Sequence, residues 1–478
     1  MSENTAFHNP TVLFAERRII LMAIPFYAKA PDNQGYIKNM EVLGFSDLDK
    51  SSMFQMGIHK TDDGKYYLYG TNWGGTRYGV FINDVTNPTN PKYLKTLQLA
   101  DPIEYPTTRC LKCQVADGLL IVSVFSGGGP GEVVDIDKSL KPPKCQNGVQ
   151  IYSIKEDPEN PKFLSYWDNG MPRGFGVHRF MYDGGNYVHL TSEAFGFEGF
   201  IYRILDISDL KNPIEIGRWW LPEQHAHGYA GREIEKGPSP SYLDRAHIHG
   251  PPFVRGDKCY LGCSGSGLSI LDVSDLTRPK CIGQLKLKPP FSGGLAGSRT
   301  HTALPLPGRD LLVVTNEGER YSWFTTERIK AAGPQPLNNL HMIDISDPTN
   351  PTLIAEFPYP EVPESYPYKN FTVAHFGIQG PFGPHNIHEP MAGKPCIEQR
   401  GDRLYCCYFH AGMRVYDLSD EYYIKEIGYF IPPNPDYVCF PALPGPRMAT
   451  TEDCVVDDRG NIFMCCLEDG LYVLRMEE

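Results

Sequence analysis

A short phrase recurs along the 478-residue chain and limits the folds that the chain can adopt. In each copy an alternating apolar segment runs up to an Asp, a turn rich in Asn-Pro or Arg-Pro follows, and a second apolar segment comes next. Asp, Ser, Asn and Pro each favour turns for a physical reason, so every copy predicts two strands joined by a turn. The copies lie at residues 81–97, 151–167, 204–220, 270–286, 342–358 and 415–430.

A second type of hairpin is expected upstream of these phrases, because a Gly near a turn precedes a β-rich run. Seven such signals stand at residues 62–70, 116–124, 183–191, 255–263, 307–315, 400–408 and 458–466. Each repeat then holds four strands, which is one blade of a β-propeller. The sequence predicts an all-β fold, a single domain spanning 1–478, with seven four-stranded antiparallel blades. The last repeat lacks a fourth strand, and we expect the N-terminal segment at 40–50 to close that blade.

The strands before the Asp, ILDIS, ILDVS and MIDIS, resemble the LVIVD-repeat family of β-propellers. In fold the chain is also more distantly similar to selenium-binding and methanethiol oxidase proteins. The resemblance implies the propeller fold. It implies little about activity, because propellers carry many unrelated functions.

Charge and composition narrow the class of partner. The net charge of −12 disfavours nucleic acid and anionic membranes, and the chain has no apolar run of about 18 residues that would span a bilayer. The 13 cysteines include adjacent pairs, which suit buried thiols in a reducing compartment better than a disulfide framework. We expect a cytoplasmic protein that acts on a small molecule, with no nucleic acid or membrane partner. Homo-oligomerisation stays open.

Histidines precede the inner hairpins of most repeats. The inner strand of each blade lines the channel of a propeller, so residues at its start converge on one mouth. The histidines are His59, His178, His247, His249, His301, His385 and His388. Imidazole suits Fe, Cu and Zn. We therefore expect a divalent transition metal, with Fe or Cu favoured over Zn or Mn, held by His178, His249, His301 and His388. The alternative for any one ring is that it plugs the channel or bonds backbone groups.

Other polar residues are expected near the same mouth. A carboxylate behind an imidazole fixes its tautomer, and a cation can hold an anionic group of the substrate. Candidates for contacting the substrate or supporting the ligands are His59, Arg109, Glu193, His247, Arg299, His385, His410, Glu452 and Glu468. Candidates for proton transfer are His225, His227, Glu317 and Tyr242.

Four long connections between blades, at 219–245, 286–300, 358–383 and 431–447, are rich in aromatic residues and Pro. They predict a partly apolar pocket over the mouth, although an oligomer interface is the alternative. We expect a metal-dependent enzyme for a small aromatic or apolar molecule, and an oxidoreductase in the first place. A metal-assisted lyase or hydratase that uses His and Glu for proton transfer is the second candidate, and a non-catalytic binding scaffold is the third.

Overall fold

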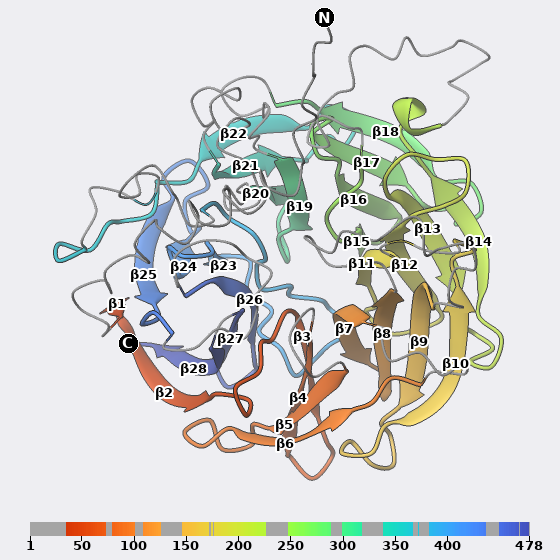
Figure 1. Cartoon of the computed structure of the whole chain (residues 1–478). Coiled ribbons are helices and arrows are strands. Elements are labelled where there is room, and N and C mark those ends of the chain that lie inside the picture. The colour runs from red at the N-terminus through yellow and green to blue at the C-terminus, as the bar shows by residue number, and fades with distance from the viewer. Residues whose placement is uncertain are drawn as a thin grey trace, which may run out of the picture.

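Seven four-stranded antiparallel sheets make up the described part of the chain. The computed structural model describes residues 35–72, 79–100, 109–125, 146–171, 174, 176–225, 247–287, 299–317, 338–366, 371, 382–435, 449–467 and 469–477. The sheets surround a central axis, with the first strand of most sheets innermost (Figure 1). The predicted seven-bladed β-propeller is confirmed.

The first four blades each use consecutive strands. Blade 1 contains β3 (Met56–Lys60), β4 (Tyr66–Thr71), β5 (Val80–Asp84) and β6 (Lys92–Leu97). Blade 2 contains β7 (Arg109–Ala116), β8 (Leu119–Phe125), β9 (Gly148–Ser153) and β10 (Lys162–Asp168). Blade 3 contains β11 (Val177–Met181), β12 (Tyr187–Ser192), β13 (Ile201–Asp206) and β14 (Ile214–Trp219). Blade 4 contains β15 (Phe253–Arg255), β16 (Lys258–Gly262), β17 (Leu268–Asp272) and β18 (Lys280–Leu285).

Blade 5 also uses consecutive strands, whereas blades 6 and 7 each include a strand from the start of the chain. Blade 5 contains β19 (Arg299–Pro305), β20 (Leu311–Glu317), β21 (Leu340–Asp344) and β22 (Thr352–Glu356). Blade 6 contains β23 (Arg403–Cys407), β24 (Met413–Asp417), β25 (Lys425–Ile431) and the N-terminal β1 (Tyr36–Lys38). Blade 7 contains β26 (Thr451–Val456), β27 (Ile462–Cys466), β28 (Gly470–Met476) and the N-terminal β2 (Met40–Ser46).

The N-terminal segment therefore closes two blades rather than one. β2 pairs antiparallel with β28, which confirms that residues 40–50 supply the missing strand of blade 7. β1 pairs with β25 as an outer strand of blade 6, which the sequence did not predict. In blade 6 the innermost place belongs to an irregular segment, joined to the blade by the isolated bridge between Ile387 and Cys406. Pro384 and Pro390 flank this segment, and proline cannot donate to a strand ladder.

Turn chemistry explains why the third strands end where they do. The side chains of five aspartates each accept a hydrogen bond at 2.8–2.9 Å from the backbone N–H two residues later. These aspartates are the last residues of β5, β13, β17, β21 and β24, namely Asp84, Asp206, Asp272, Asp344 and Asp417. Such Asx turns confirm the strand–turn–strand interpretation of the repeated phrase.

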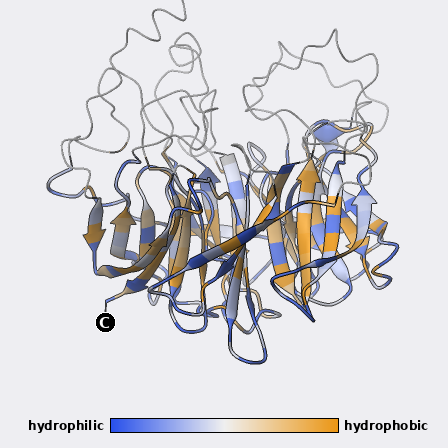
Figure 2. Ribbon diagram, turned by 60° about the horizontal axis from the view of Figure 1, so that its bottom comes forward, coloured by the Kyte–Doolittle hydropathy of each residue, from blue (hydrophilic) through white to orange (hydrophobic). Residues whose placement is uncertain are grey.

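The core lies between neighbouring blades. Tyr67 and Ile82 of blade 1, for example, belong to one buried cluster with Val122 and Tyr152 of blade 2. Hydrophobic residues (orange) concentrate in the strands and hydrophilic residues in many of the turns (Figure 2). Within the described ranges, no helix is long and apolar enough to cross a membrane.

A segment after blade 6's irregular inner stretch crosses the channel. We call residues 389–399 the crossing segment. Gly393 donates its N–H to Asp183 Oδ1 of blade 3 at 2.8 Å, and Glu389 forms an ion pair with Lys112 of blade 2 at 2.7 Å. Met391 is buried in the largest apolar cluster. Asp183 follows the end of β11, so the crossing segment lies at the ends of the inner strands, away from their beginnings. The light-blue trace through the middle of the ring in Figure 1 follows this path.

A buried histidine of blade 3 makes stability depend on pH. His189 lies in β12, and its Nδ1 is 2.7 Å from the Tyr202 hydroxyl. Burial lowers the pKa of His189 from 6.5 to about 4. The unfolded chain therefore binds more protons than the folded chain between these pH values, and stability falls as pH falls through that window. From pH 7 to 5 we expect this one group to cost about 2 kcal/mol. Urea unfolding of wild type and His189→Gln at both pH values measures the difference, and equal pH slopes would contradict it.

Candidate metal centre

Irregularities in the inner strands bring polar side chains to one level of the channel. The pairing register shifts around His178 in blade 3, around His301 and Thr302 in blade 5, and around Glu452 in blade 7. A β-bulge changes the direction of a side chain and is common beside functional sites. The bulges therefore account locally for how these strands present His178, His301 and Glu452 to the channel.

Five imidazoles form a continuous row across blades 3 to 6. The ring centroids of His178 and His249 are 4.7 Å apart and nearly parallel. His249 is 4.8 Å from His301, and His301 is 4.9 Å from His385. His247 joins the row 5.1 Å from His249. The sequence prediction placed these five residues at one mouth, and the structure brings them together.

Two carboxylates connect the row. Glu317, the last residue of β20, has Oε2 3.0 Å from His249 Nδ1 and Oε1 3.5 Å from His385 Nε2. The Nδ1 atom of His385 lies 3.2 Å from Oε1 of Glu452, which is fully buried. His385 thus lies between two carboxylates, and either one can orient its ring.

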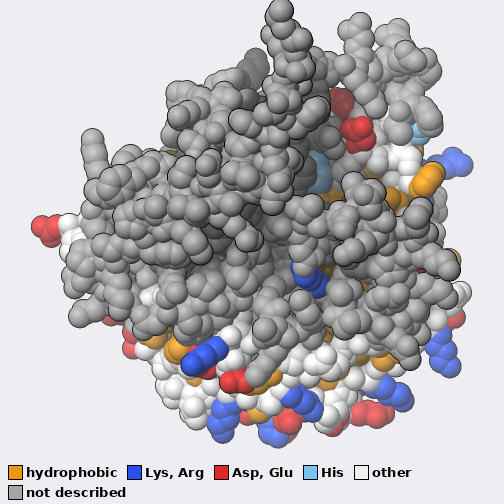
Figure 3. Space-filling view, in the orientation of Figure 1, with side chains coloured by type: hydrophobic (Ala, Val, Ile, Leu, Met, Phe, Trp, Pro, Cys, Tyr) orange, Lys and Arg blue, Asp and Glu red, His pale blue; other side chains and the backbone are white. Residues whose placement is uncertain are grey.

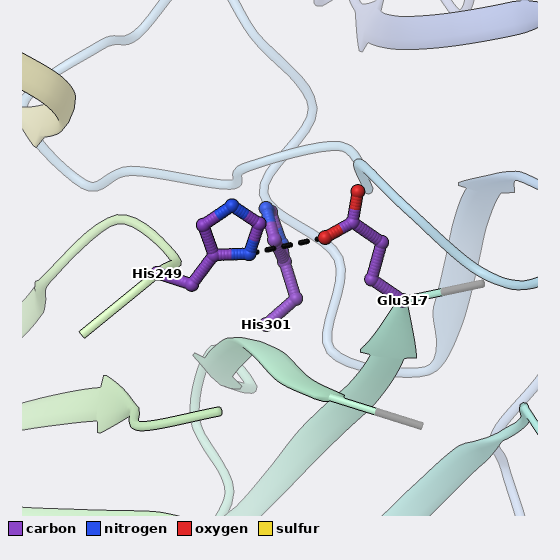
Figure 4. A group of neighbouring side chains, drawn as sticks. All are labelled: His249, His301 and Glu317. Atoms are coloured by element: carbon purple, nitrogen blue, oxygen red, sulfur yellow. Dashed lines mark ion pairs between the residues drawn. The ribbon is translucent and has the colours of Figure 1, made fainter. Parts of the chain in front are cut away.

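Three of these residues offer a donor set for a metal ion. One ligand atom each from His249, His301 and Glu317 lies within 4.8 Å of the others. Figure 4 shows the two rings and the carboxylate converging, with Glu317 extending from the end of its strand. Two histidines and one carboxylate with open positions are the typical ligands of non-haem Fe(II) oxygenases.

The protonation states suit metal binding. Burial, with a smaller contribution from neighbouring histidines, holds the pKa of His301 well below its usual value. Burial alone would raise the pKa of Glu317, but the nearby His249, His385 and His301 outweigh it and hold that pKa well below normal. The site therefore presents a neutral imidazole and an ionised carboxylate, the forms that ligate metals.

Hydrogen bonding leaves ring nitrogens available. His301 Nδ1 is 2.8 Å from Thr302 Oγ1, which fixes the ring, whereas its buried Nε2 has no hydrogen-bond partner among the described residues. Both ring nitrogens of His178 are also buried and have no hydrogen-bond partner among the described residues. His178 stacks between Phe200, at 4.7 Å, and His249. The ring of His178 thereby holds the plane of His249.

A separate apolar cluster joins blades 1, 2 and 7. It contains Phe54, Leu111, Phe125 and Leu467, all of them buried. The guanidinium of Arg179 lies 5.4 Å from the centre of the Phe54 ring, so blade 3 contacts this cluster through the residue that follows His178. In Figure 3 histidine side chains (pale blue) are visible, one of them deep in a hollow near the middle of the face.

Two predicted histidines bond backbone groups instead of facing this centre. His388 Nδ1 accepts a hydrogen bond from the Val456 N–H at 3.1 Å, and its Nε2 is 2.9 Å from the Glu398 carbonyl oxygen. Both ring nitrogens are therefore occupied, and the structure places His388 outside the ligand set. His410 Nε2 is 3.0 Å from the carbonyl oxygen of Phe371.

The structure also describes three further candidates. His59 is the fourth residue of β3, next to the hairpin turn, so it lies at the far end of its strand from the mouth. His225 forms a β-bridge with Phe197. The Glu193 carbonyl oxygen accepts from Arg203 at 3.1 Å. The sequence prediction placed His59 at the mouth because position along the sequence alone cannot distinguish the two ends of an inner strand.

Arg109 begins β7 and is half-buried. For Arg299 only the backbone, at the start of β19, is described. The remaining candidates, His227, Tyr242 and Glu468, lie outside the described residues. Much of the four long connections lies outside them too.

Sequence reasoning missed the hydroxyls that fix the bulges. The second strands carry Ser123, Thr191 and Thr315, which accept backbone N–H groups from Lys112, Arg179 and Thr302. A Ser or Thr near the end of each of these three second strands was the available signal.

A family model described as LVIVD repeat matches residues 253–286 and 337–357. Two segments of the chain thus match the LVIVD repeat. The matched residues contain β15 to β18 of blade 4 and β21 and β22 of blade 5, so the LVIVD repeat corresponds to blade strands that include the ILDVS and MIDIS phrases.

No curated protein matches this chain in sequence. Solved structures match it at low identity. A Lactobacillus plantarum protein is 13% identical, covers 83% of this chain and 90% of its own, and has a TM-score of 0.49. Chaetomium thermophilum Sqt1 is 10% identical over 91% and 97%, with a TM-score of 0.46. The computationally designed Ika8 protein is 9% identical over 88% and 96%, with a TM-score of 0.41. The strand pairing establishes the fold.

Proposed function

We propose that this protein is a non-haem iron enzyme that oxidises a small aromatic or apolar molecule with dioxygen. The observation that carries the proposal is the set of two histidines and one carboxylate, His249, His301 and Glu317, with ligand atoms within 4.8 Å of one another. This donor set is typical of Fe(II) sites that keep open positions for substrate and O₂.

The surroundings support this assignment. The buried His301 Nε2 has no described hydrogen-bond partner, and leaving such an atom unsatisfied costs about 1–3 kcal/mol. A metal ion would satisfy it. His385, held by Glu452, contacts Glu317 on the side away from His249, as the groups behind a metal ligand commonly do. The apolar cluster of Phe54, Leu111, Phe125 and Leu467, which Arg179 contacts beside His178, suits an apolar substrate.

Metal analysis of the purified full-length protein tests the proposal. After chelation and anaerobic titration with Fe(II), we expect one tightly held iron per chain and an EPR signal from its nitrosyl adduct. Oxygen uptake with a panel of small aromatic molecules then reports turnover. His189→Gln, a buried histidine outside the row, is the matched control and should bind iron as wild type does.

Two outcomes would replace this proposal. Stoichiometric zinc, with an activity that needs no O₂, would favour a metal-assisted lyase or hydratase that uses His385 and Glu452 to move protons. Absence of any stoichiometric metal would leave only a binding scaffold.

A further inference from the structure

A buried glutamine of blade 1 has an unsatisfied side chain. Gln55 is 1% exposed, and neither its amide nitrogen nor its amide oxygen has a hydrogen-bond partner among the described residues. Buried amides in folded proteins are almost always hydrogen-bonded, because a lost bond to water must be replaced. Gln55 therefore needs an explanation that the fold alone does not give.

The repeat architecture shows where Gln55 belongs. Its backbone N–H bonds a hydroxyl on the second strand of its blade, and the same bond recurs in three other blades. The donor and acceptor pairs are Gln55 and Thr71 at 3.0 Å, Lys112 and Ser123 at 2.9 Å, Arg179 and Thr191 at 3.3 Å, and Thr302 and Thr315 at 3.1 Å. Gln55 is thus the blade 1 member of a ring of equivalent positions.

At two of these equivalent positions the side chain reaches across the channel to another part of the chain. Lys112 of blade 2 reaches Glu389 of the crossing segment, at 2.7 Å. Arg179 of blade 3 reaches over the ring of Phe54 in blade 1. Gln55 starts from the equivalent place in blade 1, so we expect its amide group to face the channel as well.

The surroundings of Gln55 define the ligand. The preceding residue, Phe54, belongs to the buried cluster with Leu111, Phe125 and Leu467. Two of these four side chains are aromatic, and they suit a flat apolar body. The Gln55 amide offers both a donor and an acceptor, and a hydroxyl group can satisfy both.

We propose that Gln55 binds the hydroxyl group of the substrate, and that the substrate class is phenols and aromatic alcohols whose ring packs on the cluster of Phe54, Leu111, Phe125 and Leu467. The assignment of this ligand as a substrate rests on the proposed function, but its binding does not require iron. A site built to hydrogen-bond a hydroxyl rejects an analogue without it, because the buried amide is then left unpaired.

Calorimetric titration of the full-length protein, as purified and after chelation, tests this with three probes. We expect p-cresol to bind at least about 10-fold more tightly than toluene, as one buried hydrogen bond would give. p-Methylanisole, which accepts but does not donate, should bind with intermediate affinity. In Gln55→Met, of similar shape but without the amide, the preference for p-cresol over toluene should disappear.

Asn83→Leu is the matched control, because Asn83 is a fully buried amide of the same blade that bonds the Leu68 carbonyl oxygen instead. Its preference for p-cresol should equal that of wild type. Equal affinities of wild type for p-cresol and toluene would overturn the inference without any variant, and so would a preference that survives in Gln55→Met. A preference for p-cresol over toluene in a protein without stoichiometric iron would support the Gln55 site and refute the iron enzyme. Stoichiometric iron without that preference would support the iron enzyme and refute the Gln55 site.

Discussion

Glu317→Gln is expected to weaken Fe(II) binding by more than ~100-fold, the upper end of what replacing a group behind a ligand costs. The substitution keeps the shape of the side chain but removes the negative charge that lies 3.0 Å from His249 Nδ1. His301→Ala removes a neutral ligand and should have an effect of the same order. Competition with a calibrated chelator measures both affinities.

A graded series separates a metal centre from general damage. His385→Gln should cost about 10–100-fold in iron affinity, since His385 acts only through its contact with Glu317. Glu452→Gln should cost less, because it is one contact further away. His189→Gln should cost nothing. Equal losses across the series, or an unchanged affinity in Glu317→Gln, would show that these residues do not hold the metal.

Lys112→Met is expected to destabilise the fold by about 3 kcal/mol. The Lys112 side chain is 6% exposed and pairs with Glu389 of the crossing segment at 2.7 Å, so its loss removes the direct ion-pair partner of a largely buried carboxylate. Removing one partner of a buried pair costs about 3–5 kcal/mol. We take the low end because Glu389 is 21% exposed and still accepts from Gln114 at 2.8 Å.

The double variant Lys112→Met/Glu389→Gln provides the control. Without the carboxylate charge, most of the lost stability should return, because replacing both partners of a buried pair is often nearly neutral. Denaturant unfolding measures stability, and proteolysis near residues 389–399 reports whether the crossing segment has detached. A single variant no less stable than the double variant would mean that the pair contributes no net attraction.

The blade pattern could be predicted because its causes are local. Each third strand ends in an Asp whose side chain closes its own turn, as at Asp84 and Asp344, and this chemistry is visible in the sequence. The pairing of β2 with β28 was predictable too, because the seventh repeat visibly lacked a strand. The pairing of β1 with β25 could not be predicted, because β1 has only three residues and nothing in them signals an added outer strand.

The site could be predicted only in part. The convergence of His178, His249 and His301 follows from their place before the inner hairpins. The direction of a ring depends on bulges and on backbone partners from other blades, which sequence does not show. His388 illustrates this, because the Val456 N–H that occupies its Nδ1 is 68 residues away. Gln55 carried no signal at all until its equivalence to Lys112 was visible in space.

The pairing of β2 with β28 has a consequence for how the protein is made. Met40 lies opposite Met476, so the contact that completes the ring joins strands that are very far apart in the sequence. During synthesis β2 is made before the blades and has no partner until β28 has been translated. Pairing over such a long sequence separation is slow, and an unpaired strand edge is prone to aggregation. The nascent chain must therefore keep β2 from pairing wrongly while the strands between are made, and the ring can close only after β28 has been made.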